Sequence, residues 1–148
     1  MNKKLKTYKI LEKIAHMDVE SEQKILKDLK NIKEEMETHI KDLRTRISKE
    51  RELIAKDSIW GGRFQDFQKA TELEIDKLNL KIQQIDFRIE SEKEILLDFF
   101  ATEKKFGHMV TQKEMKIQKE EERKEMIAME DLILMRSKNN TTSIPRPH

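Results

Sequence analysis

The side chains best suited to catalysis or metal binding are four histidines, scattered along the chain at His16, His39, His108 and His148. None of them belongs to the H-E-x-x-H pattern of zinc proteases, and the nucleophile-elbow, P-loop and dinucleotide-binding patterns are also missing. Because the chain has no cysteine, a thiolate zinc site, a disulfide framework and a cysteine nucleophile are excluded. The sequence therefore predicts no catalytic, cofactor-binding or metal-binding residues, and a protein that is not an enzyme.

The elements that hold these side chains are predicted to be long helices. Of 148 residues, 41% are charged, and only three are glycine and two proline, too few to supply the turns of a sheet-containing domain. The 31 Lys and Arg residues are interspersed with 29 Asp and Glu residues, whereas nucleic-acid-binding proteins usually carry a one-signed basic face. We expect neither nucleic acid nor a small molecule as the partner.

Membrane insertion and secretion are not expected either. The longest unbroken apolar runs have four residues. A transmembrane helix needs roughly 18 or more apolar residues, and a signal peptide also needs a longer apolar region. The sequence therefore predicts a cytoplasmic protein.

Two breaks divide the chain into a single coiled-coil hairpin and a tail. The first break, residues 57–62, contains two of the three glycines and is predicted to be a loop. The second break, residues 138–148, is polar, ends in Pro-Arg-Pro-His and is predicted to be disordered. The predicted helices cover residues 4–56 and 63–137, within a hairpin of residues 1–137.

The second helix carries the clearer packing pattern. Its apolar residues recur at alternating steps of three and four, interrupted by Glu92, Glu103 and Lys113, which is the heptad repeat of a coiled coil. We call these positions the seam, because they face the partner helix. The predicted apolar seam residues are Ile75, Leu78, Ile82, Ile85, Ile89, Leu96, Phe99, Phe106, Val110 and Ile117.

The first helix has a less regular pattern. Two consecutive steps of four, ending at Ile40, predict a stutter that locally unwinds the supercoil; without it, His39 would take the seam position. Nearer the N-terminus Asp18 and Glu22 fall in the seam, where we expect weaker packing. The predicted apolar seam residues are Tyr8, Leu11, Ala15, Ile25, Leu29, Ile32, Met36, Ile40, Leu43, Ile47 and Ile54.

The lengths of the helices predict how they pair. Folding at Gly61 pairs residue i with about residue 120 − i, so the first helix is used up near Met115. Residues 118–125 contain no apolar side chain, so the seam fades where the partner ends. The sequence therefore predicts an all-α, antiparallel hairpin whose second helix overhangs the first. Such folding would bring His16 near His108, and a two-histidine metal site there is the less favoured alternative to ordinary surface residues.

Apolar residues return in the overhang, where the chain has no partner left for them. They are Met126, Ile127, Met129, Leu132, Ile133, Leu134 and Met135. Exposed apolar surface of this extent usually marks a binding site, and methionine side chains adapt to partners of irregular shape. The alternative is a helix end that folds back or forms a dimer contact.

Three aromatic residues lie close together at the loop end of the hairpin. They are Trp60, Phe64 and Phe67. Either they close that end of the seam, or they form an aromatic patch for another protein, since Trp and Phe are enriched in interface cores.

Several features of the sequence together point to a known family. The opening segment Leu5–Val19 is followed by repeated Glu and Lys, and an F-x-x-F pattern at Phe64 and Phe67 starts the second helix. The charged run from residue 120 to 125 leads to an acidic pair and an arginine within residues 129–136. With the hairpin architecture and the size, these features resemble the FliJ family, small components of the bacterial flagellar type III export apparatus.

The resemblance implies a function and a set of partners. FliJ-like proteins are similar to the coiled-coil gamma stalk of rotary ATP synthases. Their open end, which holds both termini, enters the pore of the hexameric export ATPase. Their hairpin body contacts the membrane export gate, and some members bind export chaperones. No cofactor is implied, and the membrane is reached only through partners, at the cytoplasmic face of the inner membrane. By position, the ATPase-facing residues would be Leu5, Tyr8, Leu11, Met126, Met129, Leu132, Ile133 and Met135, and the gate-facing residues would be Phe64 and Phe67.

Three other functions stay open at this point. The least favoured is nucleic-acid binding, suggested by five lysines against one glutamate in residues 1–13; it predicts a steep salt dependence of association. The equivalent stalk of a virulence type III secretion system is barely separable by sequence. A structural coiled coil that dimerises or spaces its partners belongs to a different class, and a stable dimer that does not need residues 119–148 would favour it.

Overall fold

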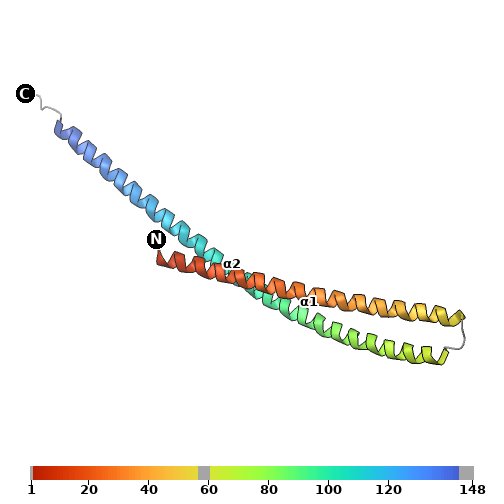
Figure 1. Cartoon of the computed structure of the whole chain (residues 1–148). Helices are drawn as coiled ribbons and strands as arrows, with labels where there is room; N and C mark the ends of the chain where they lie inside the picture. The colour runs from red at the N-terminus through yellow and green to blue at the C-terminus, as the bar shows by residue number, and fades with distance from the viewer. Residues whose placement is uncertain (1, 57–60, 144–148) are drawn as a thin grey trace, which may run out of the picture. The chain divides into compact units, whose positions relative to one another are not determined.

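The computed structural model describes residues 2–56 and 61–143, and all of these except Asn2 lie in two α-helices (Figure 1). Helix α1 spans Lys3–Lys56 and helix α2 spans Gly61–Ser143. No residue of the two described ranges forms a strand, so the predicted all-α fold is confirmed. The chain divides into two compact units: the hairpin unit, Ala15–Thr102, and the terminal unit, Met1–Ile14 with Glu103–His148.

Helix α1 begins at an N-cap that the sequence supplies. The side-chain oxygen Oδ1 of Asn2 accepts a hydrogen bond of 3.0 Å from the backbone N–H of Lys4. Asparagine is among the preferred N-cap residues, because its side chain satisfies a backbone donor that has no partner within the helix. The last described residue of the helix is Lys56.

Helix α2 is longer than the sequence predicts. It begins at Gly61 instead of residue 63, and residues 138–143, which are predicted to belong to a disordered tail, are helical. The asparagine, threonine and serine residues of this stretch each cost up to about 0.7 kcal/mol in a helix relative to alanine. Each residue added to an existing helix also gains a hydrogen bond, which offsets this cost. The first residue that cannot continue a helix is Pro145. The other residues of the predicted loop and tail, 57–60 and 144–148, lie outside the described residues.

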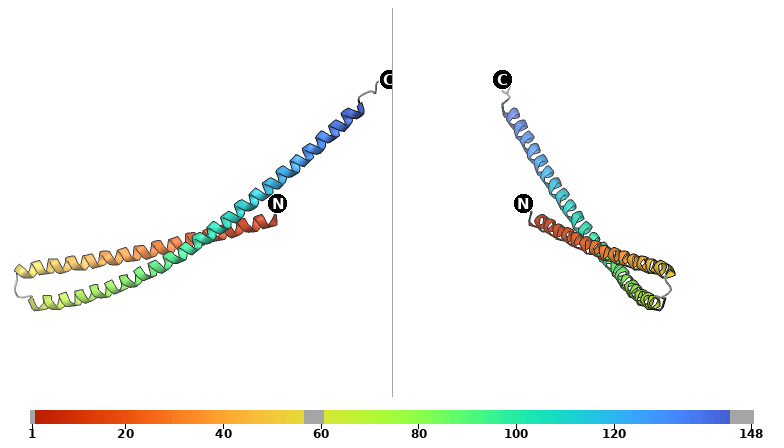
Figure 2. Two further views of the ribbon diagram at one scale, coloured as in Figure 1. Left: turned by 180° about the vertical axis from the view of Figure 1, so that it is seen from behind. Right: turned by 45° about the vertical axis from the view of Figure 1, so that its right-hand side comes forward.

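In the hairpin unit the two helices lie side by side and run in opposite directions, as the orange-to-yellow and green ribbons show (Figure 1) and as both further views agree (Figure 2). The ammonium of Lys33 lies 2.6 Å from the carboxylate of Asp86. The predicted fold pairs Lys33 with residue 87, so the antiparallel pairing is confirmed here.

The seam of α2 is confirmed throughout. Each of its ten predicted apolar residues is buried or half-buried, and so are the polar interruptions Glu92, Glu103 and Lys113. The heptad steps of this helix therefore need no correction.

The seam of α1 differs from the prediction in its phase. Its buried and half-buried residues follow alternating steps of four and three without interruption from residue 15 to 47, so there is no stutter. Leu26 is buried in place of Ile25, and the half-buried Lys33 takes the position expected for Ile32. The error has a physical cause: a lysine can cover apolar surface with its methylene stem while its ammonium reaches a charged partner.

Most of the other residues that were predicted to lie in the α1 seam are buried or half-buried, but Asp18 is not. Leu29, Met36, Ile40, Leu43, Ile47 and Ile54 are buried or half-buried as predicted, and so are Tyr8, Leu11 and Ala15. Glu22 does fall in the seam, but Asp18 is exposed and its neighbour Val19 is buried. His39 is exposed beside the buried Ile40.

Two apolar clusters hold the hairpin unit together. Near the loop, Ile40, Leu43 and Ile47 of α1 pack with Ile75 of α2. Farther along, Leu26 and Leu29 pack with Ile89. Burying such a side chain contributes about 1.5–3 kcal/mol, so these clusters are the main source of stability in this unit.

In the terminal unit, the first residues of α1 pack against α2. Lys9 forms an ion pair of 3.4 Å with Glu114, and Leu5 and Val110 are buried. From residue 118 to 139, every side chain of α2 is exposed. The predicted fading of the seam after Ile117 is therefore confirmed.

Candidate functional site

Helix α2 exposes a run of apolar side chains near its end, the C-terminal apolar segment, residues 126–135. Seven of its large apolar side chains are 47–67% exposed. They are Met126, Ile127, Met129, Leu132, Ile133, Leu134 and Met135. This exposure agrees with the sequence-based expectation that the chain itself does not cover them.

The apolar side chains of this segment surround the helix axis and do not form a single stripe. Successive residues of an α-helix are turned by about 100°, so Leu132, Ile133 and Leu134 already point in three different directions. Only Glu130 and Asp131 carry charge within the segment. Such a helix end suits a partner that encloses it, whereas an ordinary amphipathic helix suits a partner on one side.

The α1 residues assigned to the same site by the resemblance lie in a different environment. Leu5 is buried, and Tyr8 and Leu11 are half-buried. Leu5 therefore offers little surface to another protein while the terminal unit keeps this packing. The partner-binding role of these three residues stays a prediction.

Phe64 and Phe67 pack against the apolar cluster near the loop. Both are half-buried, and their ring centroids lie 6.5 Å apart with the planes tilted by 37°. This packing favours the first of the two alternatives, in which these rings close the loop end of the seam, while an aromatic patch for another protein and contact with an export gate stay predictions. Trp60 lies outside the described residues.

A carboxyl group is buried in the seam of the hairpin unit. Glu22 is 5% exposed, and its Oε1 atom has no hydrogen-bond partner among the described residues. The pKa of Glu22 is raised from 4.5 to about 7, mainly by burial. A hydrogen bond with Glu92 and the negative charge of Glu92 also raise this pKa, while the positive charge of Arg88 lowers it. Two carboxyl groups share a hydrogen bond only when one holds the proton, so Glu22 is a group that can be protonated near neutral pH.

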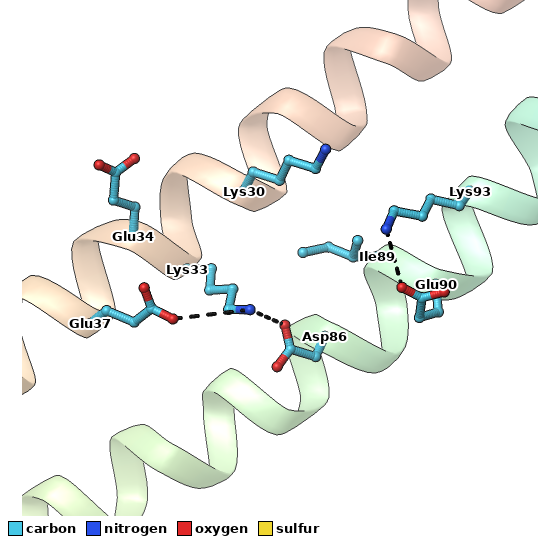
Figure 3. A pocket seen from close by; sticks show the side chains of 8 residues that line it. All are labelled: Lys30, Lys33, Glu34, Glu37, Asp86, Ile89, Glu90 and Lys93. Carbon is cyan, nitrogen blue, oxygen red and sulfur yellow. Dashed lines mark hydrogen bonds and ion pairs between the residues drawn. The ribbon is translucent and has the colours of Figure 1, made fainter.

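A charged groove runs between the helices of the hairpin unit beside Lys33 (Figure 3). The hydrogen bond with Asp86 raises the pKa of Lys33 against the opposing effect of burial, and the charges of Asp86 and Glu37 add to the rise. Lys93 forms a second ion pair of 3.2 Å with Glu90 in the same groove. Because positive and negative side chains alternate, the groove offers no single charge for a ligand to match. Its volume is about 600 Å³, and its lining comprises Lys30, Lys33, Glu34, Glu37, Asp86, Ile89, Glu90 and Lys93.

A second groove, in the terminal unit, is basic. Its volume is about 690 Å³, and no Asp or Glu lines it. The sequence pattern did not predict this groove, although folding at Gly61 pairs Lys4 with about residue 116 and so brings these lysines together. The groove is lined by Lys4, Tyr8, His108, Met109, Thr111, Gln112, Lys113, Met115, Lys116 and Lys119.

Two of the histidines make surface contacts with carboxylates. His16 lies 3.0 Å from Glu20, and His39 lies 3.4 Å from Glu74 across the two helices. Within residues 2–56 and 61–143, no group of three or more His, Asp or Glu side chains is placed to hold a metal ion. Neither helix, over the same residues, has an apolar stretch long enough to cross a bilayer.

Comparison of the chain with protein-family models, with curated proteins and with solved structures gives no match. The exposure and the all-round apolar character of the C-terminal apolar segment are therefore the main basis for assigning a function.

Proposed function

We propose that this chain is a two-helix stalk of the FliJ type in a bacterial type III protein export apparatus, and that its C-terminal apolar segment binds the hexameric export ATPase. The observation that carries the proposal is the exposure of seven large apolar side chains around all sides of one helix end. A ring of subunits with a central pore is a partner that can bury such an end on every side.

The energetics support a binding role for this segment. Fully burying a Leu, Ile or Met side chain contributes about 1.5–3 kcal/mol, and several such side chains together offset the cost of association, about 4–15 kcal/mol. The flexible side chains of Met126, Met129 and Met135 can adapt to subunits that present slightly different surfaces. The segment stays in the solvent while the chain is alone, which fits a component that binds its partner after folding.

The rest of the chain has a supporting role in this proposal. The continuous heptad seam makes the hairpin unit stiff enough to hold a fixed position, and its body with Phe64 and Phe67 contacts the cytoplasmic part of the export gate. Export chaperones are further partners, no cofactor is needed, and the protein acts in the cytoplasm and at the inner membrane only through its partners.

ATP turnover by the export ATPase of the same organism tests the proposal. The full chain should stimulate turnover, and the double variant Met129→Asp/Ile133→Asp should not. The matched control Leu53→Asp/Leu97→Asp places the same charges at equally exposed positions, 61% and 66%, and should stimulate like the parent chain. Equal helicity of the three proteins by circular dichroism ensures that lost stimulation reports lost binding.

The same experiment separates the rival functions. If the full chain neither binds the ATPase nor changes turnover, the structural coiled-coil function replaces the stalk function. If it stimulates, deletion of the gene distinguishes the two kinds of export apparatus: loss of swimming indicates the flagellar system, and loss of effector secretion with intact swimming indicates the virulence system.

A further inference from the structure

The C-terminal apolar segment contains the most exposed thioether groups among the described residues. Three of its seven large apolar side chains are methionines, each 66–67% exposed. We call Met126, Met129 and Met135 the segment methionines. The chain has eight methionines and no cysteine, so thioethers are the only sulfur groups that an oxidant can attack.

The other methionines give a scale of exposure within the same chain. Met17 and Met115 are 56% and 53% exposed and lie outside the C-terminal apolar segment. Met36 and Met109 are half-buried, and Met1 lies outside the described residues. Because neighbouring side chains shield a half-buried thioether, an oxidant in the solvent should attack the segment methionines before Met36 and Met109.

We propose that the segment methionines are a reversible oxidation site, at which hydrogen peroxide abolishes the partner-binding surface of the C-terminal apolar segment. The thioether sulfur attacks one oxygen of the peroxide, a sulfur–oxygen bond forms, the oxygen–oxygen bond breaks and water leaves. The sulfur loses two electrons, and the peroxide gains them. A methionine sulfoxide reductase reverses the step, in which two thiols are oxidised to a disulfide and the sulfoxide oxygen leaves as water.

The positions of the segment methionines place the modification on opposite sides of the helix. Successive residues are turned by about 100°, so Met129 lies about 60° and Met135 about 180° around the helix from Met126. A partner that surrounds this helix end therefore buries a modified side chain on either side. This consequence rests on the proposed function, in which the segment binds such a partner.

Oxidation changes the chemistry of the surface without changing its sequence. It converts a flexible apolar thioether into a polar sulfoxide and so disrupts methionine-rich interfaces. A polar group buried without a hydrogen-bond partner opposes binding, and we expect affinity to fall at least about tenfold. The leucine and isoleucine residues of the segment do not undergo this reaction, so the effect depends on the three sulfur atoms.

The oxidation site is tested first on the full chain alone. After limited treatment with hydrogen peroxide, mass spectrometry of its peptides should find one added oxygen at each segment methionine before Met36 and Met109. The treated chain should be retained less strongly than the untreated chain on a hydrophobic-interaction column. Incubation with a methionine sulfoxide reductase and a thiol should restore the retention.

Substitution by leucine separates the sulfur chemistry from the apolar character. The triple variant Met126→Leu/Met129→Leu/Met135→Leu keeps apolar side chains of similar volume but cannot form a sulfoxide in the segment. The matched control Met17→Leu/Met115→Leu removes two exposed sulfur atoms elsewhere. Each protein is compared with itself before and after peroxide, which is removed before the export ATPase is added.

Peroxide treatment should affect the parent chain and the control in the same way. Their column retention should fall, and the concentration needed for half-maximal stimulation of the ATPase should rise at least about tenfold. The triple variant should keep its own untreated retention and its own half-maximal concentration. Circular dichroism should find the three untreated proteins equally helical.

Two results would overturn the oxidation site. One is a parent chain whose retention survives peroxide, and the other is a triple variant that peroxide affects as strongly as the parent. If the untreated chain does not stimulate the ATPase, the proposed function fails, while retention and its recovery with the reductase still decide the oxidation site. If treated and untreated chains stimulate equally, the proposed function stands and the loss of binding on oxidation is refuted.

Discussion

Replacing Glu22 by glutamine should make the hairpin more stable at neutral and alkaline pH. The carboxyl of Glu22 is buried in the seam, where it forms a hydrogen bond with Glu92 and feels the opposing charge of Arg88. Glutamine has nearly the same shape, keeps a donor for Glu92 and cannot ionise. The variant therefore imitates the protonated form of Glu22 at every pH.

The size and sign of the effect follow from the raised pKa. In the folded chain the pKa of Glu22 is about 7, against 4.5 for the ordinary group. Below 4.5 the group is protonated in both the folded and the unfolded state, and it does not disfavour folding. As the pH rises toward 7, the unfolded chain releases the proton more readily, so folding is progressively disfavoured. One pKa unit corresponds to about 1.4 kcal/mol, so the free energy of unfolding falls by up to about 3 kcal/mol.

Urea unfolding followed by circular dichroism, at several pH values between about 4.5 and about 8, measures this effect. Other titrating groups change both proteins alike, so the informative quantity is the difference between the parent chain and Glu22→Gln. This difference should be near zero at the acidic end and should grow to about 3 kcal/mol at the alkaline end.

The matched control is Glu35→Gln, which removes a carboxylate from an exposed position of the same helix. Its unfolding free energy should follow that of the parent chain in parallel across the pH range. If Glu22→Gln also follows in parallel, Glu22 ionises without cost in the folded chain, and the argument from burial is refuted.

Two further substitutions probe the packing of the two units. Leu26→Ala should lower the free energy of unfolding by about 2–4 kcal/mol, because Leu26 is buried. Ile25→Ala, at the neighbouring exposed position, should lower it by less than about 1 kcal/mol. A larger loss for Ile25→Ala than for Leu26→Ala would show that Ile25 lies in the seam, as the stutter predicts. Gly107→Ala should raise the stability by about 0.5–1 kcal/mol. The added Cβ would approach only the carboxylate of Glu12, at 3.8 Å, and a fall in the urea midpoint would show that the glycine is needed.

The sequence was sufficient to predict the fold and the seam residues of α2, because apolar residues occupy most of the heptad positions of that helix. It was insufficient to predict the seam residues of α1, because two isoleucines, at residues 25 and 32, lie directly beside the true seam positions. Apolar character alone favours Ile32 over Lys33. What decides between them is the partner across the interface, Asp86, which a single helix does not reveal.

The candidate site could be predicted only in part. The C-terminal apolar segment was found because it follows the point where α1 ends, which depends on lengths alone. The burial of Leu5 and the packing of Phe64 and Phe67 depend on side chains of the opposite helix. The hydrogen bond between Glu22 and Glu92 was missed for the same reason, although each residue was placed in the seam.

The polar seam residues have a consequence for the alignment of the two helices. Long heptad repeats can slide by seven residues and still match their apolar positions. If α1 moved by one heptad in the hairpin unit, Lys33 would lie opposite Lys93 or Asn79 in place of Asp86. Either shift would lose the 2.6 Å ion pair, and one would set two lysines against each other.

Glu22 opposes the same shifts for a different reason. One heptad away from Glu92, its carboxyl would face Phe99 or Ile85, where no hydrogen-bonding partner exists and burial of a polar group is costly. Lys33 and Glu22 therefore reduce the stability of the seam but favour one alignment over its nearest alternatives, as single polar residues do in other coiled coils. It follows that the double variant Glu22→Leu/Lys33→Met should have a higher free energy of unfolding than the parent chain. The distribution of distances between spin labels at Ile32 and Leu80 should nevertheless be broader in this variant, because several alignments are populated. A single sharp distance would show that the apolar residues alone set the alignment.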